Sequence, residues 1–175
     1  MSQPVVGVVM GSDSDEKVME KCAEVLRIFG IPHEMTIASA HRSPDRVREY
    51  ALKASDRGLK LIIAGAGGAA HLAGVIASHT DIPVIGVPLA SGPLLGIDAL
   101  LATTQMPAGV PVACVGVGEP GARNAAVLAA RILSLNDRGL AMRLREYRKA
   151  LSAGVEEKAR RLKARKKTDT RKRKR

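Results

Sequence analysis

The sequence predicts an α/β protein, a three-layer α/β/α sandwich whose doubly wound parallel sheet is of flavodoxin-like type. Two observations lead to this class. Short apolar runs alternate five times with amphipathic stretches over residues 1–137, which is typical of βα units. Three of the loops that follow these runs are rich in Gly, Ser or His, and in such sheets the ligand binds at the loops after the strands.

The first two strands and helices are defined by hydrophobic spacing and helix-start signals. Residues 4–10 (PVVGVVM) are apolar without alternation, as expected of a strand buried on both faces. Residues 14–30 place apolar side chains at spacings of three and four, which predicts a helix. A second strand is expected over residues 34–38. Ser43 and Pro44 form a typical N-cap and first residue of a second helix, whose inward-facing side chains would be Val47, Tyr50, Ala51 and Ala54.

The alternation continues to about residue 135. The predicted strands are 60–66, 83–87 and 112–115, and the predicted helices run from the glycines after the third strand to about Ser78, from 94 to 104 and from 121 to 135. Every apolar run is short enough for a strand and every amphipathic stretch long enough for a covering helix. The pattern therefore completes five βα units.

The alternation of apolar runs and amphipathic stretches ends at about Asn136. One apolar stripe runs along an otherwise charged helix, formed by Leu140, Leu144, Tyr147 and Leu151. Such a stripe needs a partner, so we expect the helix to pack on a neighbouring subunit. The stretch beyond Leu162 has no apolar periodicity, and we expect a disordered basic tail. The predicted organisation is a catalytic α/β domain over residues 1–137, a C-terminal helix over 138–162 and a tail over 163–175.

The net charge of +11 belongs to the C-terminal end of the chain. Residues 138–175 carry a net charge of +13, which leaves −2 for residues 1–137. The chain has only one Phe, two Tyr and no Trp, whereas surfaces that bind single-stranded nucleic acid stack bases on several aromatic rings. The body is therefore not expected to bind nucleic acid specifically, although the tail could contact polyanions without specificity.

Other classes of protein are also disfavoured. No apolar run reaches the length of a membrane span, and the first residues lack the basic region of a signal peptide, so we expect a cytoplasmic protein. Cys22 and Cys114 stand far apart, without a CxxC spacing or a neighbouring His. We therefore expect reduced thiols, with no metal site and no cofactor.

The loops after the first and second strands carry candidate functional residues. Gly11 permits a tight turn, and the Ser and Asp residues that follow it could hold a phosphate at a helix start or only cap that helix. In the second loop, His41 can exchange protons near neutral pH, and Arg42 offers a forked cation suited to phosphate. This loop also leads into a helix N-terminus, which favours anions.

The loop after the third strand combines small residues with a histidine. Gly67 and Gly68 allow a ligand to approach the backbone closely, and His71 would project near the same mouth. The spacing matches neither the GxGxxG motif of dinucleotide folds nor a P-loop, and no Lys follows. The three loops together indicate a phosphate-bearing small molecule and a histidine acid or base.

The same loops resemble one known family. The matching motifs are MGSDSD at 10–15, SAHRSPD at 39–45, AGAGGAAHLAG at 64–74, GVPL with Ser91 at 86–91, LLGIDALLATTQMPAGVPVA at 94–113 and GARNAA at 121–126. The chain is similar in these motifs to the class I PurE proteins of purine biosynthesis, the N5-carboxyaminoimidazole ribonucleotide mutases. It departs from the usual pattern at Ala73 and Ala90.

The resemblance implies a function and roles for particular residues. The family moves a carboxylate from the exocyclic nitrogen of an aminoimidazole ribonucleotide to ring carbon four, without ATP or metal. His41 matches the histidine expected to act as acid and then as base. Ser12 and Arg42 match phosphate contacts, and Asp15 matches a contact to the ribose phosphate or hydroxyls. The other implied substrate-binding positions are Gly11, Ser39, Ala40, Gly67, Gly68, His71 and Leu72, and the family assembles as octamers.

Two other functions stay open at this stage. A class II-type enzyme would carboxylate aminoimidazole ribonucleotide directly with CO2, and a non-catalytic nucleotide-binding module would keep the pocket without turnover. The intact GAGGAAHL segment favours the class I resemblance, and retention of His41 argues against the module. The basic tail also leaves open an association with RNA.

Overall fold

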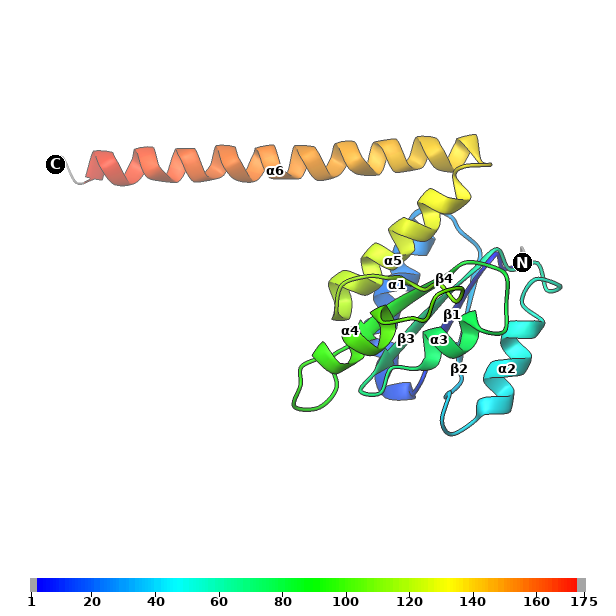
Figure 1. Cartoon of the computed structure of the whole chain (residues 1–175). Helices are drawn as coiled ribbons and strands as arrows, with labels where there is room; N and C mark the ends of the chain where they lie inside the picture. Colours follow the sequence, from blue (N-terminus) through cyan, green and yellow to red (C-terminus); the bar gives the residue numbers. More distant parts are fainter. Residues whose placement is uncertain (1–2, 173–175) are drawn as a thin grey trace. The chain divides into compact units, whose positions relative to one another are not determined.

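A five-stranded parallel sheet forms the centre of the first of two compact units (Figure 1). The computed structural model describes residues 3–172, with side chains for residues 3–163. The strand order is β2-β1-β3-β4-β5, which confirms the predicted doubly wound sheet. The strands are β1 Val6–Met10, β2 His33–Ile37, β3 Leu61–Gly67, β4 Val84–Leu89 and β5 Ala113–Cys114.

The helices of this unit cover both faces of the sheet. They are α1 Glu16–Ile28, α2 Pro44–Leu52, α3 Leu72–Ala77, α4 Ile97–Thr104 and α5 Gly118–Leu133, and a short 3-10 helix, η1 Asp13–Asp15, precedes α1. Helices α1 and α5 pack against each other on one face, while α2, α3 and α4 lie on the other (Figure 1). The chain therefore leaves β1 and β3 toward opposite faces, and this reversal opens a crevice at their carboxyl ends.

The register places the functional loops level with one another. Met10, the last residue of β1, pairs with Ile37 of β2 and with Gly65 of β3. Gly67, the last residue of β3, pairs with Leu89 of β4. The loops after β1, β2, β3 and β4 consequently begin at the same edge of the sheet.

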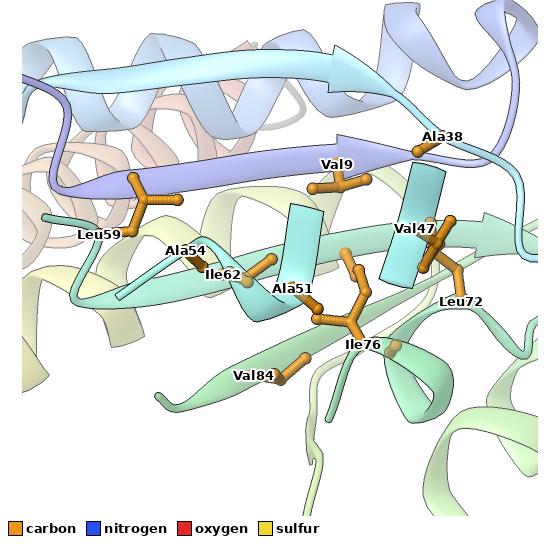
Figure 2. Close-up of a cluster of buried hydrophobic side chains, with 12 residues drawn as sticks. Val9, Ala38, Val47, Ala51, Ala54, Leu59, Ile62, Leu72, Ile76 and Val84 are labelled. Carbon is orange, nitrogen blue, oxygen red and sulfur yellow. The ribbon is translucent and has the colours of Figure 1, made fainter. Parts of the chain in front are cut away.

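The core confirms the inward face predicted for the second helix. Val47, Ala51 and Ala54 lie fully buried in a cluster with Val9, Ile62 and Ile76, and Tyr50 packs against it (Figure 2). Burying a side chain of the size of Val47, Ile62 or Ile76 stabilises the fold by about 1.5–3 kcal/mol. This packing fixes α2 on the sheet and so fixes the loop that leads into it.

A polar network at the amino end of the sheet ties α2 to β2. The Tyr50 hydroxyl donates to Glu34 at 2.8 Å, and Arg57 forms an ion pair with the same carboxylate. The Arg57 guanidinium also lies 5.2 Å from the centre of the Tyr50 ring. A Cβ atom on Gly7 would overlap the Tyr50 hydroxyl. Glycine is required at this position because the tyrosine crosses directly over β1.

Several element boundaries differ from the sequence-based expectation by a few residues. Helix α5 begins at Gly118 and not at 121, because Pro120 falls within its first turn, where a missing N–H costs nothing. Helix α4 begins at Ile97 and not at 94. Strand β5 is two residues long, where four were expected.

The second unit, from Ser134 onward, is dominated by one long helix, α6 Arg138–Lys172. Asp137 begins it by accepting a hydrogen bond from the Leu140 backbone N–H at 2.9 Å. Leu140 and Leu144 are buried, whereas Leu151 is 56% exposed, so the predicted stripe is covered only in its first half. The helix continues past the expected end at Leu162, because Ala, Lys and Arg are strong helix formers.

Two further expectations concern the C-terminal region and the membrane. Residues 163–172 of the predicted disordered tail are helical and belong to α6. Residues 173–175 lie outside the described residues, and their disorder stays a prediction. Across the described part of the chain, every helix is too short or too polar to traverse a bilayer.

Candidate active site

A cavity of about 410 Å³ opens where the loops after β1, β2, β3 and β4 meet. Its lining residues are Gly11, Ser12, Ser14, Asp15, Ser39, Ala40, His41, Arg42, Ala66, Gly67, Ala69, Leu72 and Ser91. The cavity is large enough for a small ligand, and its wall combines one imidazole and one guanidinium with several hydroxyls.

The loop after β1 forms a compact turn that lines the cavity and is closed by its own hydrogen bonds. Ser12 caps η1 through its hydroxyl, which accepts from the Ser14 backbone N–H at 3.4 Å. The Asp15 carboxylate in return accepts from the Ser12 backbone N–H at 3.1 Å. Both alternatives for this loop are compatible with the geometry, since the capping residues also line the cavity.

The two carboxylates of this turn have different electrostatic environments. Burial raises the pKa of Asp15, and this effect outweighs its backbone and hydroxyl donors. The Ser12 hydroxyl donates to Asp13 at 2.9 Å and lowers the pKa of that carboxyl. Asp13 is exposed and absent from the cavity wall, whereas Asp15 lines it. Asp15 is therefore the carboxylate available to a ligand.

The loop after β2 is held by serines at both ends. The Ser39 backbone N–H donates to the Ser43 hydroxyl at 3.0 Å, and that hydroxyl donates back to the Ser39 carbonyl at 3.2 Å. The Ser39 hydroxyl accepts from the Arg42 backbone N–H at 3.2 Å. Ser43 thus holds this loop and not the first turn of α2, where its side chain makes no capping hydrogen bond. This closed turn places His41 and Arg42 side by side at the cavity.

The loop after β3 brings a second imidazole to the first. Nε2 of His41 lies 2.9 Å from Nδ1 of His71, and the two rings meet edge to face with centroids 5.0 Å apart. Gly68 adopts a φ of +59° and turns the chain toward His71. A Cβ atom on Gly67 would overlap the Ser91 hydroxyl, so the loops after β3 and β4 touch at this glycine.

The structure brings together nearly all of the predicted site residues. Nine of them line the cavity, namely Gly11, Ser12, Asp15, Ser39, Ala40, His41, Arg42, Gly67 and Leu72. His71 does not line it but reaches it through His41, and Gly68 lies in the turn between them.

Four further lining residues were not predicted as site residues: Ser14, Ala66, Ala69 and Ser91. Ser14, Ala66 and Ala69 lie within the quoted motifs, and this proximity is the sequence signal that could have found them. Ser91 is a polar residue directly after a buried strand, which is itself a signal.

A second, larger cavity lies at the opposite edge of the sheet. Its volume is about 670 Å³, and residues 77–84 and 109–111 form most of its wall. It contains the imidazole of His79 and the carboxylate of Asp81, but none of its lining residues is Lys or Arg. This wall suits a phosphate poorly.

The smaller cavity can bind a phosphate and can transfer a proton. Arg42 and the Ser hydroxyls are donors suited to phosphate oxygens, and His41 can act as acid or base. Among the side chains of residues 3–163, no three His, Cys, Asp or Glu groups gather closely enough to hold a metal ion.

Comparisons with known proteins agree with this site. The AIR carboxylase family model matches residues 5–153. The chain is 55% identical over 160 residues to the N5-carboxyaminoimidazole ribonucleotide mutase of Pyrococcus horikoshii, covering 91% of this chain and 89% of the relative. It is 53% identical over 159 residues to the N5-carboxyaminoimidazole ribonucleotide mutase of Thermotoga maritima, covering 91% of this chain and 92% of that relative.

Solved structures show the same fold. A crystal structure of Treponema denticola PurE superimposes with a TM-score of 0.79 at 33% identity, covering 88% of this chain and 95% of that one. The structure of a Treponema denticola PurE2 variant gives a TM-score of 0.83 at 31% identity, covering 92% of this chain and 99% of that one. From its sequence, its fold and the loops that form its cavity, the chain belongs to the AIR carboxylase family.

Proposed function

We propose that this chain is an isomerase of de novo purine biosynthesis that converts N5-carboxyaminoimidazole ribonucleotide into 4-carboxy-5-aminoimidazole ribonucleotide. The observation that carries the proposal is the position of His41, which lines a cavity beside Arg42 and lies 2.9 Å from a second imidazole. Relatives with the mutase name at 53–55% identity support the same reaction. The substrate is a small phosphorylated molecule, which suits the size and the donors of the cavity.

Arg42 and the start of η1 would hold the phosphate. The Arg42 guanidinium donates to the Gly11 carbonyl at 3.3 Å, so it lies beside the loop whose Ser12 and Ser14 line the cavity. Two kinds of donor, a cation and serine hydroxyls, would then meet one phosphate. Asp15, at the same turn, would accept hydrogen bonds from ribose hydroxyls.

His41 would move the proton that the reaction needs. The imidazolium donates a proton to the exocyclic nitrogen as its bond to the carboxylate carbon breaks, which gives aminoimidazole ribonucleotide and CO2. Ring carbon four then forms a bond to CO2, and the neutral imidazole removes the proton from that carbon. An imidazole has an ordinary pKa of about 6.5 and suits both steps near neutral pH. The reaction needs no further reactant.

His71 would hold the ring of His41 in place. Its Nδ1 atom is the hydrogen-bond partner of His41 Nε2, and one proton must lie between these two nitrogens. This contact would fix the orientation of the His41 ring at the cavity mouth. The small residues Gly67 and Gly68 would let the same loop close over the base and keep CO2 from escaping into water.

A direct carboxylase that uses CO2 is the main alternative. Purified protein would be assayed with aminoimidazole ribonucleotide plus bicarbonate, with and without the ATP-dependent synthetase that makes the carbamate. We expect faster product formation only when the carbamate is supplied. Equal rates in both arms would favour the carboxylase.

The role of His41 has its own test. His41→Asn should abolish turnover while leaving the thermal unfolding temperature within about 2 °C of the parent. Turnover that survives in this variant contradicts His41 as the acid and base. Substrate binding by the parent protein without any turnover would instead indicate a binding module.

We also infer that the chain forms homo-oligomers, with an octamer expected from the family, and that it works in the cytoplasm. Leu151, Val155 and Leu162 leave an apolar row exposed on α6. In the first unit, Leu94, Leu95, Ile97 and Leu101 are also exposed, in the segment that follows Ser91. Asp98, in that segment, has a buried Oδ1 atom without a hydrogen-bond partner. Subunit contacts would cover both regions, and light scattering that gave a monomer would contradict this.

A further inference from the structure

The last 20 residues of the chain, which include the distal half of α6, hold most of the protein's excess charge. Residues 156–175 contain 12 basic and 3 acidic residues, whereas residues 1–137 have a net charge of −2. The match to the family model ends at residue 153. The charged segment therefore lies outside the family-model match, and the proposed reaction has no use for it.

The helix arranges this charge as a rod. From Lys158 to Lys172 the chain is helical and contains nine basic residues and one acidic residue. At 1.5 Å per residue this segment is about 21 Å long, so it carries one net positive charge per roughly 2.6 Å. A nucleic-acid duplex carries one negative charge per about 1.7 Å of its axis. The two linear charge densities are comparable.

The segment offers few negative charges of its own. Glu157 forms ion pairs with Arg160 and Arg161 at 2.6 and 2.8 Å. Beyond Glu157, Asp169 is the only acidic residue in the sequence. Like charges three or four residues apart destabilise a helix by a few tenths of a kcal/mol per pair. An external polyanion would remove that repulsion.

We propose that residues 158–172 of α6 bind the phosphate backbone of duplex nucleic acid without sequence specificity. The sequence has no aromatic residue after Tyr147, so it has no ring on which single-stranded bases would stack. Leu162 is the last large apolar residue, so the segment also lacks the apolar face with which a basic helix enters a bilayer. Contacts from Lys and Arg to phosphate oxygens carry no sequence information, so the binding would be independent of sequence.

The test is fluorescence anisotropy of the full-length chain with a fluorescein-labelled duplex RNA of about 20 base pairs, at about 50 and 200 mM NaCl. One variant combines Lys163→Gln, Arg165→Gln and Lys166→Gln. A matched control removes three exposed charges from the first half of the same helix, Arg138→Gln, Arg145→Gln and Arg148→Gln. Both variants should keep the parent's turnover, which shows that the body is folded.

We expect the parent to bind, with an affinity that falls about a thousandfold between the two salt concentrations if six phosphates are contacted. The distal variant should lose at least about tenfold at low salt, and its slope in a plot of log K against log salt should fall by about three. The control should stay within about threefold of the parent. A second duplex of unrelated sequence should bind equally.

Three results would overturn the proposal. The first is no binding of the duplex at low salt, and the second is equal loss of affinity in the distal variant and the control. The third is retention on phosphatidylserine vesicles without binding to the duplex, which would identify a membrane surface as the partner. Because turnover is measured separately, failure of this proposal leaves the proposed reaction untouched.

Discussion

The Arg42 guanidinium donates to the main-chain carbonyl of Gly11 at 3.3 Å, across 31 positions of sequence. The contact joins the loop after β2 to the loop after β1, directly above the cavity. Neither loop would by itself place a cation beside Ser12 and Ser14, which line the cavity. The phosphate end of the proposed site therefore depends on two loops that the sheet register brings level.

Replacing Arg42 with Lys should weaken substrate binding more than it slows the chemical step. Lysine keeps the charge but cannot donate to the Gly11 carbonyl and to a phosphate from one planar group. We expect KM to rise about tenfold to a hundredfold, as for the loss of a charged hydrogen bond, with kcat within about threefold. Steady-state kinetics with the carbamate substrate measures both.

Arg46→Lys is the matched control for this substitution. Arg46 donates to the Thr36 hydroxyl at 3.1 Å and does not line the cavity. The KM of the Arg46→Lys variant should equal that of the parent protein. A similar rise in both variants would mean that charge near α2 matters in general and that Arg42 has no special contact.

Replacing His71 tests its positioning role. His71→Phe keeps a ring of similar size but removes the partner of His41 Nε2. We expect kcat to fall about tenfold to a hundredfold, as for a misplaced catalytic group, and the pH at half-maximal kcat to shift. His71→Asn, which keeps a polar atom near the position of Nδ1, should recover most of the rate. If the pH profile of kcat were unchanged in both variants, His71 would contribute only to packing and would not position His41.

Gly67→Ala should disturb the contact between the loops after β3 and β4 at the cavity. The added methyl group overlaps the Ser91 hydroxyl and comes within 3.1 Å of the Leu89 carbonyl. We expect a loss of about 1–3 kcal/mol in the free energy of unfolding, together with lower turnover. Combining it with Ser91→Gly removes the main overlap and should recover most of the stability in urea denaturation.

Gly116→Ala provides the control for the glycine substitution. A Cβ atom there meets no other atom within 4 Å, and Gly116 has no positive φ. Its unfolding free energy should stay within about 0.5 kcal/mol of the parent. If Gly67→Ala were equally harmless, the close contact between the loops after β3 and β4 would not constrain the site.

Cys22 should resist thiol reagents in the folded protein. Burial raises the pKa of its thiol to about 12, so about one molecule in ten thousand carries the thiolate at pH 8. Titration with a chromogenic disulfide should modify at most the half-buried Cys114, and Cys22 only after unfolding. A Cys114→Ser variant that still reacts quickly would contradict the burial of Cys22.

The same pKa shift predicts a loss of stability in alkali. The folded pKa lies above the ordinary value of 9.0, so the folded state holds the proton more tightly. The stabilisation is complete below pH 9 and is lost as the pH rises toward 12, by at most about 1.4 kcal/mol per pH unit. Urea denaturation from pH 9 to 11 should show a shallower decline for Cys22→Ala than for the parent.

The sequence was sufficient to predict the strands and the loops of the site because both depend on local patterns. Buried strands such as β1 and β3 show as apolar runs, and their following loops show as Gly, Ser and His clusters. The contact between His41 and His71 was not predictable. These residues precede α2 and α3, and no local pattern gives the distance between those two helices on their common face of the sheet. The start of α5 at Gly118 was not predicted, since Gly118 and Pro120 are residues that helix interiors disfavour.

Capping and catalysis could not be separated by sequence at Ser12 and Asp15. The same hydroxyl and carboxylate that close η1 also line the cavity, so one pair of residues satisfies both patterns. Ser43 shows the opposite case. It occupies the N-cap position, yet its hydroxyl binds within the preceding loop, because the Ser39 backbone groups are nearer than those of the helix.

The two outer strands restrict how copies of this chain can associate. Strand β5 has only two residues, paired through Ala113 and Cys114, and offers almost no free main-chain groups to an incoming strand. At the other end of the sheet, β2 has five residues and pairs with β1 on one side, so it presents the longer row of main-chain groups to an incoming strand. A sheet that grew by strand addition would therefore grow from β2, and the two-residue β5 would stop that growth at the opposite edge.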